Sequence, residues 1–243
     1  MRITGNKVLI TGGTRGIGLA LATRFLALGN QVIVTGRNAY RLDQLALKDS
    51  NLETFNCDQT NPDDLYKLAG FIEKKHPDLN ILINNAGVQF NYNLSEELDA
   101  ILKINEEIAT NLVAPLHLTT SLIPVLERNQ NSAIVNVSSA LGIVPKQSAP
   151  VYSATKAAIH NFSKTLRYQL EGKIKVFDLI PALVDTDMTA GRSKDKITPE
   201  QLVDEFMEAF EKNHFEINIG KVKMLRLLHR IYPAGADRIM RRA

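Results

Sequence analysis

The chain has 243 residues, of which 44% are hydrophobic and 23% charged, and it carries a formal net charge of +3. This composition is typical of a soluble globular protein with one α/β core, and the single cysteine, Cys57, excludes an internal disulfide framework. The N-terminal stretch has neither a secretory signal nor an apolar run long enough to cross a bilayer, so we expect a cytoplasmic protein.

The ionisable residues argue against two further kinds of site. The five histidines occur singly, without the paired spacing of zinc ligands, so we expect no metal centre. Residues 221–243 carry seven Lys and Arg against one Asp, which leaves residues 1–220 with a net charge of −3. Because the larger part is weakly acidic and no aromatic residues alternate with basic ones, we expect no nucleic-acid partner.

Short β-branched apolar runs recur along the chain and predict strands. They are followed by longer segments with helical spacing, or by loops that lead to such segments. Alternation of strand and helix is typical of a parallel sheet covered on both faces, so the expected fold is a single doubly wound, Rossmann-like α/β domain over residues 1–243. The predicted strands are 7–11, 31–35, 52–55, 79–84, 132–138, 174–180 and 215–220.

Several residues mark where the predicted helices begin and end. Gly29 stands at the C-terminus of the first helix, and Asn61 followed by Pro62 caps the helix after the third strand. The segment 95–128 is predicted to be mostly helical, with a break or kink at Pro115.

Four glycines lie between Gly12 and Gly18, directly after the first predicted strand. In an open parallel sheet a ligand binds beyond the carboxyl ends of the strands, and glycines let the backbone approach a pyrophosphate at a helix N-terminus. The spacing therefore predicts a dinucleotide site, with a tight strand-to-helix turn that binds no ligand as the alternative.

Five motifs occur in the order in which they are found in the short-chain dehydrogenase/reductase family, and the chain resembles that family. The stretches "NKVLITGGTRGIGLALATRFLALGNQVIVTGR" and "LINNAGVQ" are most similar to the bacterial oxidoreductases found beside lipoteichoic-acid D-alanylation genes. The resemblance implies an oxidoreductase that moves a hydride between a nicotinamide and a carbonyl or alcohol. The five motifs are Thr11-Gly12-x3-Gly16-x-Gly18, Cys57-Asp58, "NNAG" at 84–87, Ser139, and "YSATK" at 152–156.

The resemblance implies that Asn111, Ser139, Tyr152 and Lys156 form the catalytic set. Tyr152 and Lys156 lie one helical turn apart, and a cation near a phenol favours the phenolate, so Tyr152 can exchange a proton with the reacting oxygen. Ser139 would bind that oxygen, with Ser138 in a supporting role. Asn111 would bind a water linked to Lys156, and the alternative is an asparagine that satisfies backbone groups near the predicted kink.

The same resemblance implies a set of cofactor-binding residues, most of them at the carboxyl ends of predicted strands. Asn84 would hold the central sheet together, and Asp58 would face the adenine ring unless it is a plain turn residue. The implied cofactor-binding residues are Gly12, Thr14, Arg15, Gly16, Ile17, Gly18, Arg37, Asp58, Asn85, Ala86, Gly87, Tyr152, Lys156, Pro181, Val184 and Thr186.

Two arginines favour NADP(H) over NAD(H). An NAD enzyme of this type carries an acid at the end of the second strand for the ribose 2′-hydroxyl, whereas a 2′-phosphate needs cations. Arg15 and Arg37 stand at the positions where NADP-preferring members of the family carry basic residues, and no acidic residue lies between Gln31 and Asp43.

The residues after the sixth predicted strand are expected to form a turn near the cofactor and then the cover of the substrate pocket. Ala182 follows Pro181 where the family commonly has glycine, so this turn is either regular or slightly altered. Residues 187–213 are expected to form a substrate lid, a mobile loop followed by an amphipathic helix. The expected substrate is a mainly apolar carbonyl or alcohol, because the candidate pocket residues are Val88, Gln89, Phe90, Leu141, Ile143 and Val184.

A non-catalytic dinucleotide-binding sensor on the same fold is the alternative function, because a fold by itself does not determine an activity. As partners, the resemblance implies a small-molecule substrate and a homodimer or homotetramer, formed through the segment 95–128 and the helix that carries Tyr152.

The basic C-terminal extension, residues 221–243, has apolar residues at helical spacing up to Pro233 and Gly235, which interrupt the pattern and leave only a short first helix. We expect its apolar face to pack on the body or on a partner subunit, with contact to an anionic membrane as the less favoured alternative. The apolar residues are Val222, Leu225, Leu228 and Ile231.

Overall fold

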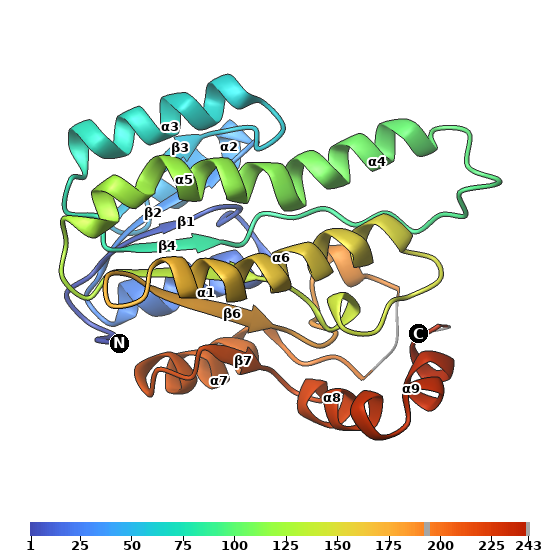
Figure 1. The fold of residues 1–243 in the computed structure, drawn as a ribbon. Coiled ribbons are helices and arrows are strands. Elements are labelled where there is room, and N and C mark those ends of the chain that lie inside the picture. The colour runs from blue at the N-terminus through green and yellow to red at the C-terminus, as the bar shows by residue number, and fades with distance from the viewer. Residues whose placement is uncertain (192–194, 242–243) are drawn as a thin grey trace.

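The structure is a computed structural model that describes residues 1–191 and 195–241. Seven parallel strands form one sheet in the order β3-β2-β1-β4-β5-β6-β7, so the strand order reverses between β1 and β4 (Figure 1). The predicted doubly wound sheet is confirmed. The strands are β1 (Lys7–Ile10), β2 (Gln31–Gly36), β3 (Leu52–Asn56), β4 (Ile81–Asn84), β5 (Ala133–Val137), β6 (Lys175–Ile180) and β7 (Glu216–Asn218).

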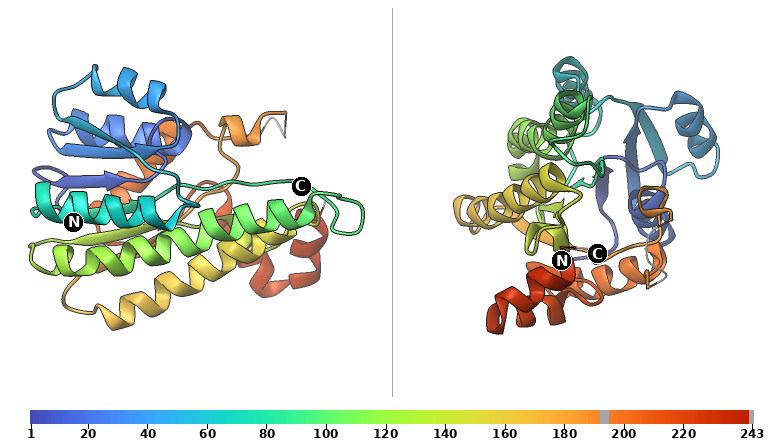
Figure 2. Two further views of the ribbon diagram at one scale, coloured as in Figure 1. Left: turned by 90° about the horizontal axis from the view of Figure 1, so that it is seen from above. Right: turned by 90° about the vertical axis from the view of Figure 1, so that its right-hand side faces the viewer.

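Helices cover both faces of the sheet, as Figure 2 shows. One face carries α3 (Pro62–Lys75), α5 (Ala114–Glu127) and α6 (Pro150–Gln169). The opposite face carries α1 (Gly16–Ala27), α2 (Ala39–Ala46) and α7 (Pro199–Glu211). The expected helix ends are confirmed: Gly29 has φ +74° after α1, and the Asn61 side chain accepts a hydrogen bond from the Asp63 N–H at the start of α3.

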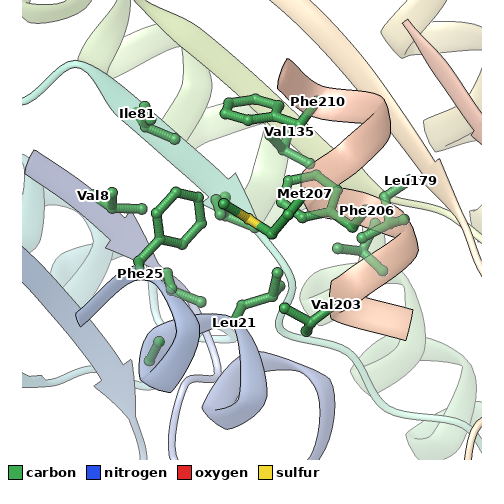
Figure 3. Packing of buried hydrophobic residues seen from close by; sticks show 14 of the residues in the cluster. Val8, Leu21, Phe25, Ile81, Val135, Leu179, Val203, Phe206, Met207 and Phe210 are labelled. Atoms are coloured by element: carbon green, nitrogen blue, oxygen red, sulfur yellow. The ribbon is translucent and has the colours of Figure 1, made fainter. Parts of the chain in front are cut away.

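The strands are apolar on both sides because both faces are covered. In β1, Val8 and Ile10 pack under α1 and α7, while Leu9 between them packs on the opposite face. Figure 3 shows the first cluster, in which Phe25 of α1 meets Phe210 of α7 edge-to-face with ring centroids 6.4 Å apart. Each large apolar side chain buried in this way stabilises the fold by about 1.5–3 kcal/mol.

The segment predicted to break at Pro115 is one continuous helical run. It begins at α4 (Ala100–Ile108), widens into a π-helical turn, η1 (Ala109–Val113), and continues as α5. Proline lacks an N–H group and its ring excludes the carbonyl four residues earlier. The wide turn just before Pro115 accommodates this, so the helix does not end. Of the predicted break or kink, the break is wrong, and the helix is instead locally distorted at this place.

Within the described residues, the run Ala100–Glu127 alone has the length and apolar composition of a membrane-spanning helix. Its second half packs on the sheet, where Leu118, Leu122 and Leu126 are fully buried or nearly so. Burial in the protein core therefore accounts for the apolar composition of this second half, whereas Ile101 and Leu102 in the first half are 69% and 70% exposed.

The segment expected to form a substrate lid divides into two parts. The amphipathic helix is confirmed as α7, but its apolar face, including Val203 and Phe206, is buried against α1 and the sheet. Because this face is part of the core, α7 cannot act as a mobile lid. Of the predicted loop, Asp187 and Met188 line the cleft described below, and residues 192–194 lie outside the described residues.

The C-terminal extension forms two helices, α8 (Val222–Ile231) and α9 (Pro233–Met240). Val222 is buried beside Ala140 and Ile180, as expected for an apolar face that packs on the body. Ile231, which was expected on that face, is 73% exposed. The expected short first helix is confirmed, because α8 ends at Ile231. Pro233 then begins α9, since its fixed φ and missing N–H suit the first turn of a helix.

Replacing Val222 tests this packing. We expect Val222→Ala to lower the free energy of unfolding by about 2 kcal/mol, because it removes buried methyl groups and leaves a cavity. Met224→Ala, at a neighbouring position that is 65% exposed, is the control and should change it by less than about 0.5 kcal/mol. Urea unfolding measures both. Deletion of residues 221–243 should destabilise the protein further. The membrane alternative would be favoured if the intact protein co-sedimented with anionic vesicles and the deletion abolished this binding without lowering stability.

Candidate active site

A cleft of about 430 Å³ opens at the carboxyl edge of the sheet, where the strand order reverses. Of the implied cofactor-binding residues, all but Val184 line it, and these include Tyr152 and Lys156. The Val184 side chain is buried in the core instead, and its backbone pairs with Ile197. The cleft is also lined by Val88 and Ser138, which were expected near the substrate and the reacting oxygen, by Cys57 of the Cys57-Asp58 motif, and by Asp187 and Met188 of the predicted lid. The lining residues that sequence reasoning did not assign to the site are Thr35, Gly36, Asn38, Arg41, Gln59, Thr110 and Val137.

The glycine turn forms one wall of this cleft for two separate reasons. Gly12 and Gly16 have φ values of +64° and +54°, which side chains disfavour. At Gly18 the obstacle is space, because a Cβ atom would lie 2.4 Å from the Gly12 carbonyl oxygen. The Arg15 side chain makes no cap hydrogen bond at the start of α1, and the first turn of α1 faces the cleft. A helix N-terminus of this kind favours a bound anion.

Hydrogen bonds join the glycine turn to the end of β4. The Thr11 hydroxyl oxygen accepts from the backbone N–H groups of Asn85 and Ala86, at 3.0 Å each. The Asn85 amide donates in return to the carbonyl oxygens of Thr11 and Gly12. The predicted role of Asn84 in the central sheet is also seen, since its amide donates to Asn136 of β5 at 2.8 Å. The two turns that flank the cleft are therefore held rigidly together.

Tyr152 and Lys156 lie in the first two turns of α6 and are both buried, as their four-residue spacing allows. The Lys156 Nζ lies 5.6 Å from the centre of the Tyr152 ring and donates a hydrogen bond of 2.7 Å to the Val137 carbonyl. Burial lowers the pKa of Lys156 to about 8, with the negative charge of Asp178 acting in the opposite direction. At neutral pH the lysine is still mostly positively charged.

The two serines after β5 are both buried. The Ser139 hydroxyl oxygen accepts a hydrogen bond from the Leu141 N–H at 3.1 Å and thereby caps the N-terminus of the short 3₁₀ helix η2 (Ala140–Gly142). Ser138, which the sequence assigned a supporting role, lines the cleft directly. The proposed catalytic serine thus lies one residue from the cleft wall, with its hydroxyl hydrogen available to donate.

Asn111 lies in the π-helical turn, and its amide satisfies backbone groups. Its Oδ1 accepts from the Val88 N–H and its Nδ2 donates to the Val88 carbonyl, both at 2.8 Å. This geometry matches the alternative interpretation of Asn111 more directly than a water relay. The asparagine fixes the loop that follows the "NNAG" motif, beside Gly87 and Lys156.

Glu107 is a functional candidate that sequence reasoning missed. This fully buried side chain, one helical turn before Asn111, accepts hydrogen bonds from the Phe90 N–H and the Tyr92 hydroxyl at 3.0 Å each. Burial raises the pKa of Glu107, and burial together with the hydrogen bond to Glu107 raises the pKa of Tyr92 to about 12. Glu107 and Asn111 together anchor the loop that carries the predicted substrate contacts, and their i, i+4 spacing was the available signal.

Three arginines lie at the end of the cleft near β2. Arg15 pairs with Asp187 at 3.1 Å and Arg37 with Glu106 at 3.2 Å, and both pairs are largely exposed to solvent. Arg41, in the first turn of α2, also lines the cleft. Exposed ion pairs of this kind contribute little to stability, so a bound anion can replace the carboxylates.

The other predicted residues have simpler surroundings. Asp58 lines the cleft, but its Oδ1 also accepts two hydrogen bonds from Thr60, which fits a turn role as well. The turn after β6 is regular, because in the described residues the only non-glycine positions with positive φ are Asn131 and Asn213, not Ala182. No group of three or more His, Cys, Asp or Glu side chains in residues 1–191 and 195–241 is placed to hold a metal ion.

The amino-acid sequence is similar to those of known short chain dehydrogenases and oxidoreductases. A family model described as short chain dehydrogenase matches residues 6–197. The chain is 38% identical over 234 residues to the uncharacterized oxidoreductase DltE of Bacillus subtilis (strain 168), covering 93% of this chain and 92% of that protein. It is 31% identical over 224 residues to an 11-beta-hydroxysteroid dehydrogenase-like 2 protein of Arabidopsis thaliana, covering 90% of this chain and 72% of that protein.

Solved structures show the same similarity. A short chain dehydrogenase from Burkholderia cenocepacia J2315 in complex with NADP matches with a TM-score of 0.89 and 25% identity, covering 99% of each chain. A short-chain dehydrogenase from Sphingobium yanoikuyae in complex with NADPH matches with a TM-score of 0.80 and 28% identity, covering 96% of each chain. A Burkholderia phymatum protein of this type in complex with NAD shares the fold with a TM-score of 0.84 at 21% identity, covering 97% of this chain and 96% of that chain.

Proposed function

Because the chain belongs to the short chain dehydrogenase family and is an NAD(P)-dependent oxidoreductase, we propose that it uses NADP(H) to interconvert a mainly apolar carbonyl and its alcohol. The observation that carries this proposal is the position of Tyr152 and Lys156 in one cleft with the glycine turn. A proton donor and a site for a dinucleotide thus share a single cavity.

In the proposed reduction, Tyr152 donates a proton to the carbonyl oxygen, and in oxidation it accepts one from the alcohol. The bound nicotinamide supplies or accepts the hydride. Lys156, held by the Val137 carbonyl, places a positive charge beside the Tyr152 ring and so stabilises the phenolate that forms when the proton leaves. Ser139 donates a hydrogen bond to the reacting oxygen and holds it against Tyr152.

The cleft suits the phosphates of a dinucleotide. A side chain at Gly13 or Gly18 would collide with neighbouring atoms at 2.6 Å or less, so these positions keep the backbone open for close approach. Arg15, Arg37 and Arg41 provide the cations that a 2′-phosphate needs at the end of β2. Two solved relatives of similar sequence are complexes with NADP or NADPH, which supports the same preference here.

Apolar side chains near the cleft support an apolar substrate. Val88 and Met188 line it, and Phe90 lies on the loop that Glu107 anchors. A screen of carbonyl and alcohol compounds, read by NADPH oxidation or NADP reduction, tests the proposal. Turnover of at least one aliphatic or aromatic carbonyl is expected, and binding of NADPH without turnover of any would favour the sensor.

The proposed assembly is a homodimer or homotetramer, as the family resemblance implies, and the proposed compartment is the cytoplasm. Sedimentation equilibrium of the purified protein tests it, because a monomer at micromolar concentration would exclude both assemblies.

The glycine turn offers a direct test of cofactor binding. We expect Gly18→Ala to weaken NADPH binding by at least about 10-fold, because the new methyl group would displace the Gly12 carbonyl from the turn. Gly70→Ala, within α3 where a Cβ atom meets nothing within 4 Å, is the matched control and should bind NADPH normally. Fluorescence titration measures both affinities, and thermal melting checks that the variants fold. Equal affinity for all three proteins would place the dinucleotide elsewhere.

A further inference from the structure

A buried carboxylate lies behind the active site and has no role in the mechanism above. Asp178, on β6, is 1% exposed, and its Oδ2 lies 2.5 Å from Nδ1 of His160 on α6. The second oxygen, Oδ1, is buried and has no hydrogen-bond partner in the described part of the chain. A buried carboxyl group with one oxygen unsatisfied is costly, so a positive charge close by would stabilise it.

Lys156 supplies such a charge on the side of the sheet that α6 covers, without a hydrogen bond or ion pair to Asp178 among the described contacts. It precedes His160 by one helical turn, so both side chains lie on the same face of α6, which packs on the sheet. The Lys156 ammonium group is bonded to the Val137 carbonyl of β5. In the sheet, Val137 of β5 is paired with Leu179 of β6. Asp178 directly precedes Leu179, so it is one residue away from the partner of the strand residue that binds Lys156.

The charges around these groups act in opposite directions. Burial lowers the pKa of Lys156, and Asp178 is the group whose charge acts to raise it. The hydrogen bond to Asp178 and the charge of Asp178 raise the pKa of His160, and burial acts in the opposite direction. Glu216 of β7 adds a smaller upward contribution, and Arg226 of α8 a smaller downward one. Arg226 is itself bonded to Glu216 at 2.6 Å, so much of its charge is compensated there. Asp178 is thus the anion shared by Lys156 and His160.

We propose that Asp178 and His160 are positioning residues that keep Lys156 positively charged inside the protein, so that Tyr152 can act at neutral pH. Asp178 supplies the negative charge that compensates the buried ammonium group. His160 holds the carboxylate in its orientation by a hydrogen bond, and its ring is partly open to solvent. The inference rests on the roles given to Tyr152 and Lys156 in the proposed function.

NMR of the protein without substrate tests the electrostatic part. The side-chain carbon signals of 13C-labelled lysine are followed against pH, and the variant Lys156→Arg identifies the Lys156 signal by its absence. We expect Asp178→Asn to lower the titration midpoint of Lys156 by about one pH unit, because an anion in a buried site is replaced by a neutral amide. His160→Gln, which can still donate a hydrogen bond to Asp178, should not lower it.

Two further comparisons make the test specific. Asp204→Asn on α7, at an exposed residue paired with Arg24, is the matched control and should leave Lys156 unchanged. If Asp178→Asn does not fold, the wild-type protein suffices, because the Lys156 signal should then shift as His160 titrates. Any one of three results would overturn the inference. The titration midpoint of Lys156 could stay unchanged in Asp178→Asn, or it could fall equally in Asp178→Asn and His160→Gln. The third is a wild-type Lys156 signal that does not respond when His160 titrates.

The pH dependence of turnover separates this inference from the proposed function. The alkaline limb of kcat for carbonyl reduction should move downward in Asp178→Asn by the same amount as the Lys156 midpoint, while folding and NADPH affinity at pH 6 stay unchanged. Agreement of the two shifts supports the inference. If Lys156 titrates lower but the rate profile does not move, the charge coupling holds and the catalytic role of Lys156 in the proposed function is wrong.

Discussion

Tyr152→Phe is expected to lower turnover of a carbonyl substrate by at least about 100-fold, because general acid catalysis contributes on that scale and phenylalanine has no proton to donate. The ring stays in place beside Lys156, and the glycine turn is untouched. NADPH should therefore bind with nearly its normal affinity. The measurement is kcat at saturating NADPH and substrate, together with a fluorescence titration of NADPH.

The matched control is Tyr168→Phe, which removes a hydroxyl from an exposed tyrosine on the same helix. It should leave kcat within a factor of two or so of the wild-type value, since surface substitutions of this kind have small effects. Retention of more than a few per cent of the wild-type rate by Tyr152→Phe would show that another group donates the proton.

Arg37→Asp is expected to shift cofactor preference from NADPH toward NADH by about 100-fold in the ratio of the two kcat/KM values. The change replaces a cation that can pair with the 2′-phosphate by an anion that repels it and that can accept a hydrogen bond from a ribose hydroxyl. The new carboxylate would also face Glu106, the present partner of Arg37. Steady-state kinetics with both cofactors give the ratio directly.

Two companion variants define the origin of the effect. Glu106→Gln should strengthen NADPH binding by a few-fold, because it frees Arg37 from a competing carboxylate. Arg128→Asp makes the same charge change at the exposed C-terminal end of α5, where its partner is Glu73, and should leave the cofactor ratio as it is. If Arg37→Asp left the ratio of the two kcat/KM values unchanged, either Arg15 would bind the 2′-phosphate instead or the cofactor would be NAD(H).

The sequence alone was sufficient for the features that depend on neighbouring residues. Short, nearly continuous runs of apolar residues, such as those around Val8 and Val135, predicted the strands, because a parallel sheet that is buried on both sides requires them. The cap at Asn61 and the glycine at Gly29 fixed helix ends through local backbone geometry. The spacing from Gly12 to Gly18 predicted the cofactor turn, because its conformation and close contacts tolerate no side chain there.

Only the tertiary structure decided the features that depend on residues far apart in the chain. The sequence carried no signal that Asp178 would meet His160 or that the backbone around Pro115 would widen into a π-helical turn. The four-residue spacing of Glu107 and Asn111 placed them on one helix face, but only the structure showed that Glu107 binds the loop at Phe90. The helix α7 was assigned to the lid but belongs to the core, and the side chain of Val184 is also buried there. Each outcome follows from how strands register and which faces pack, and local propensity does not encode these long-range contacts.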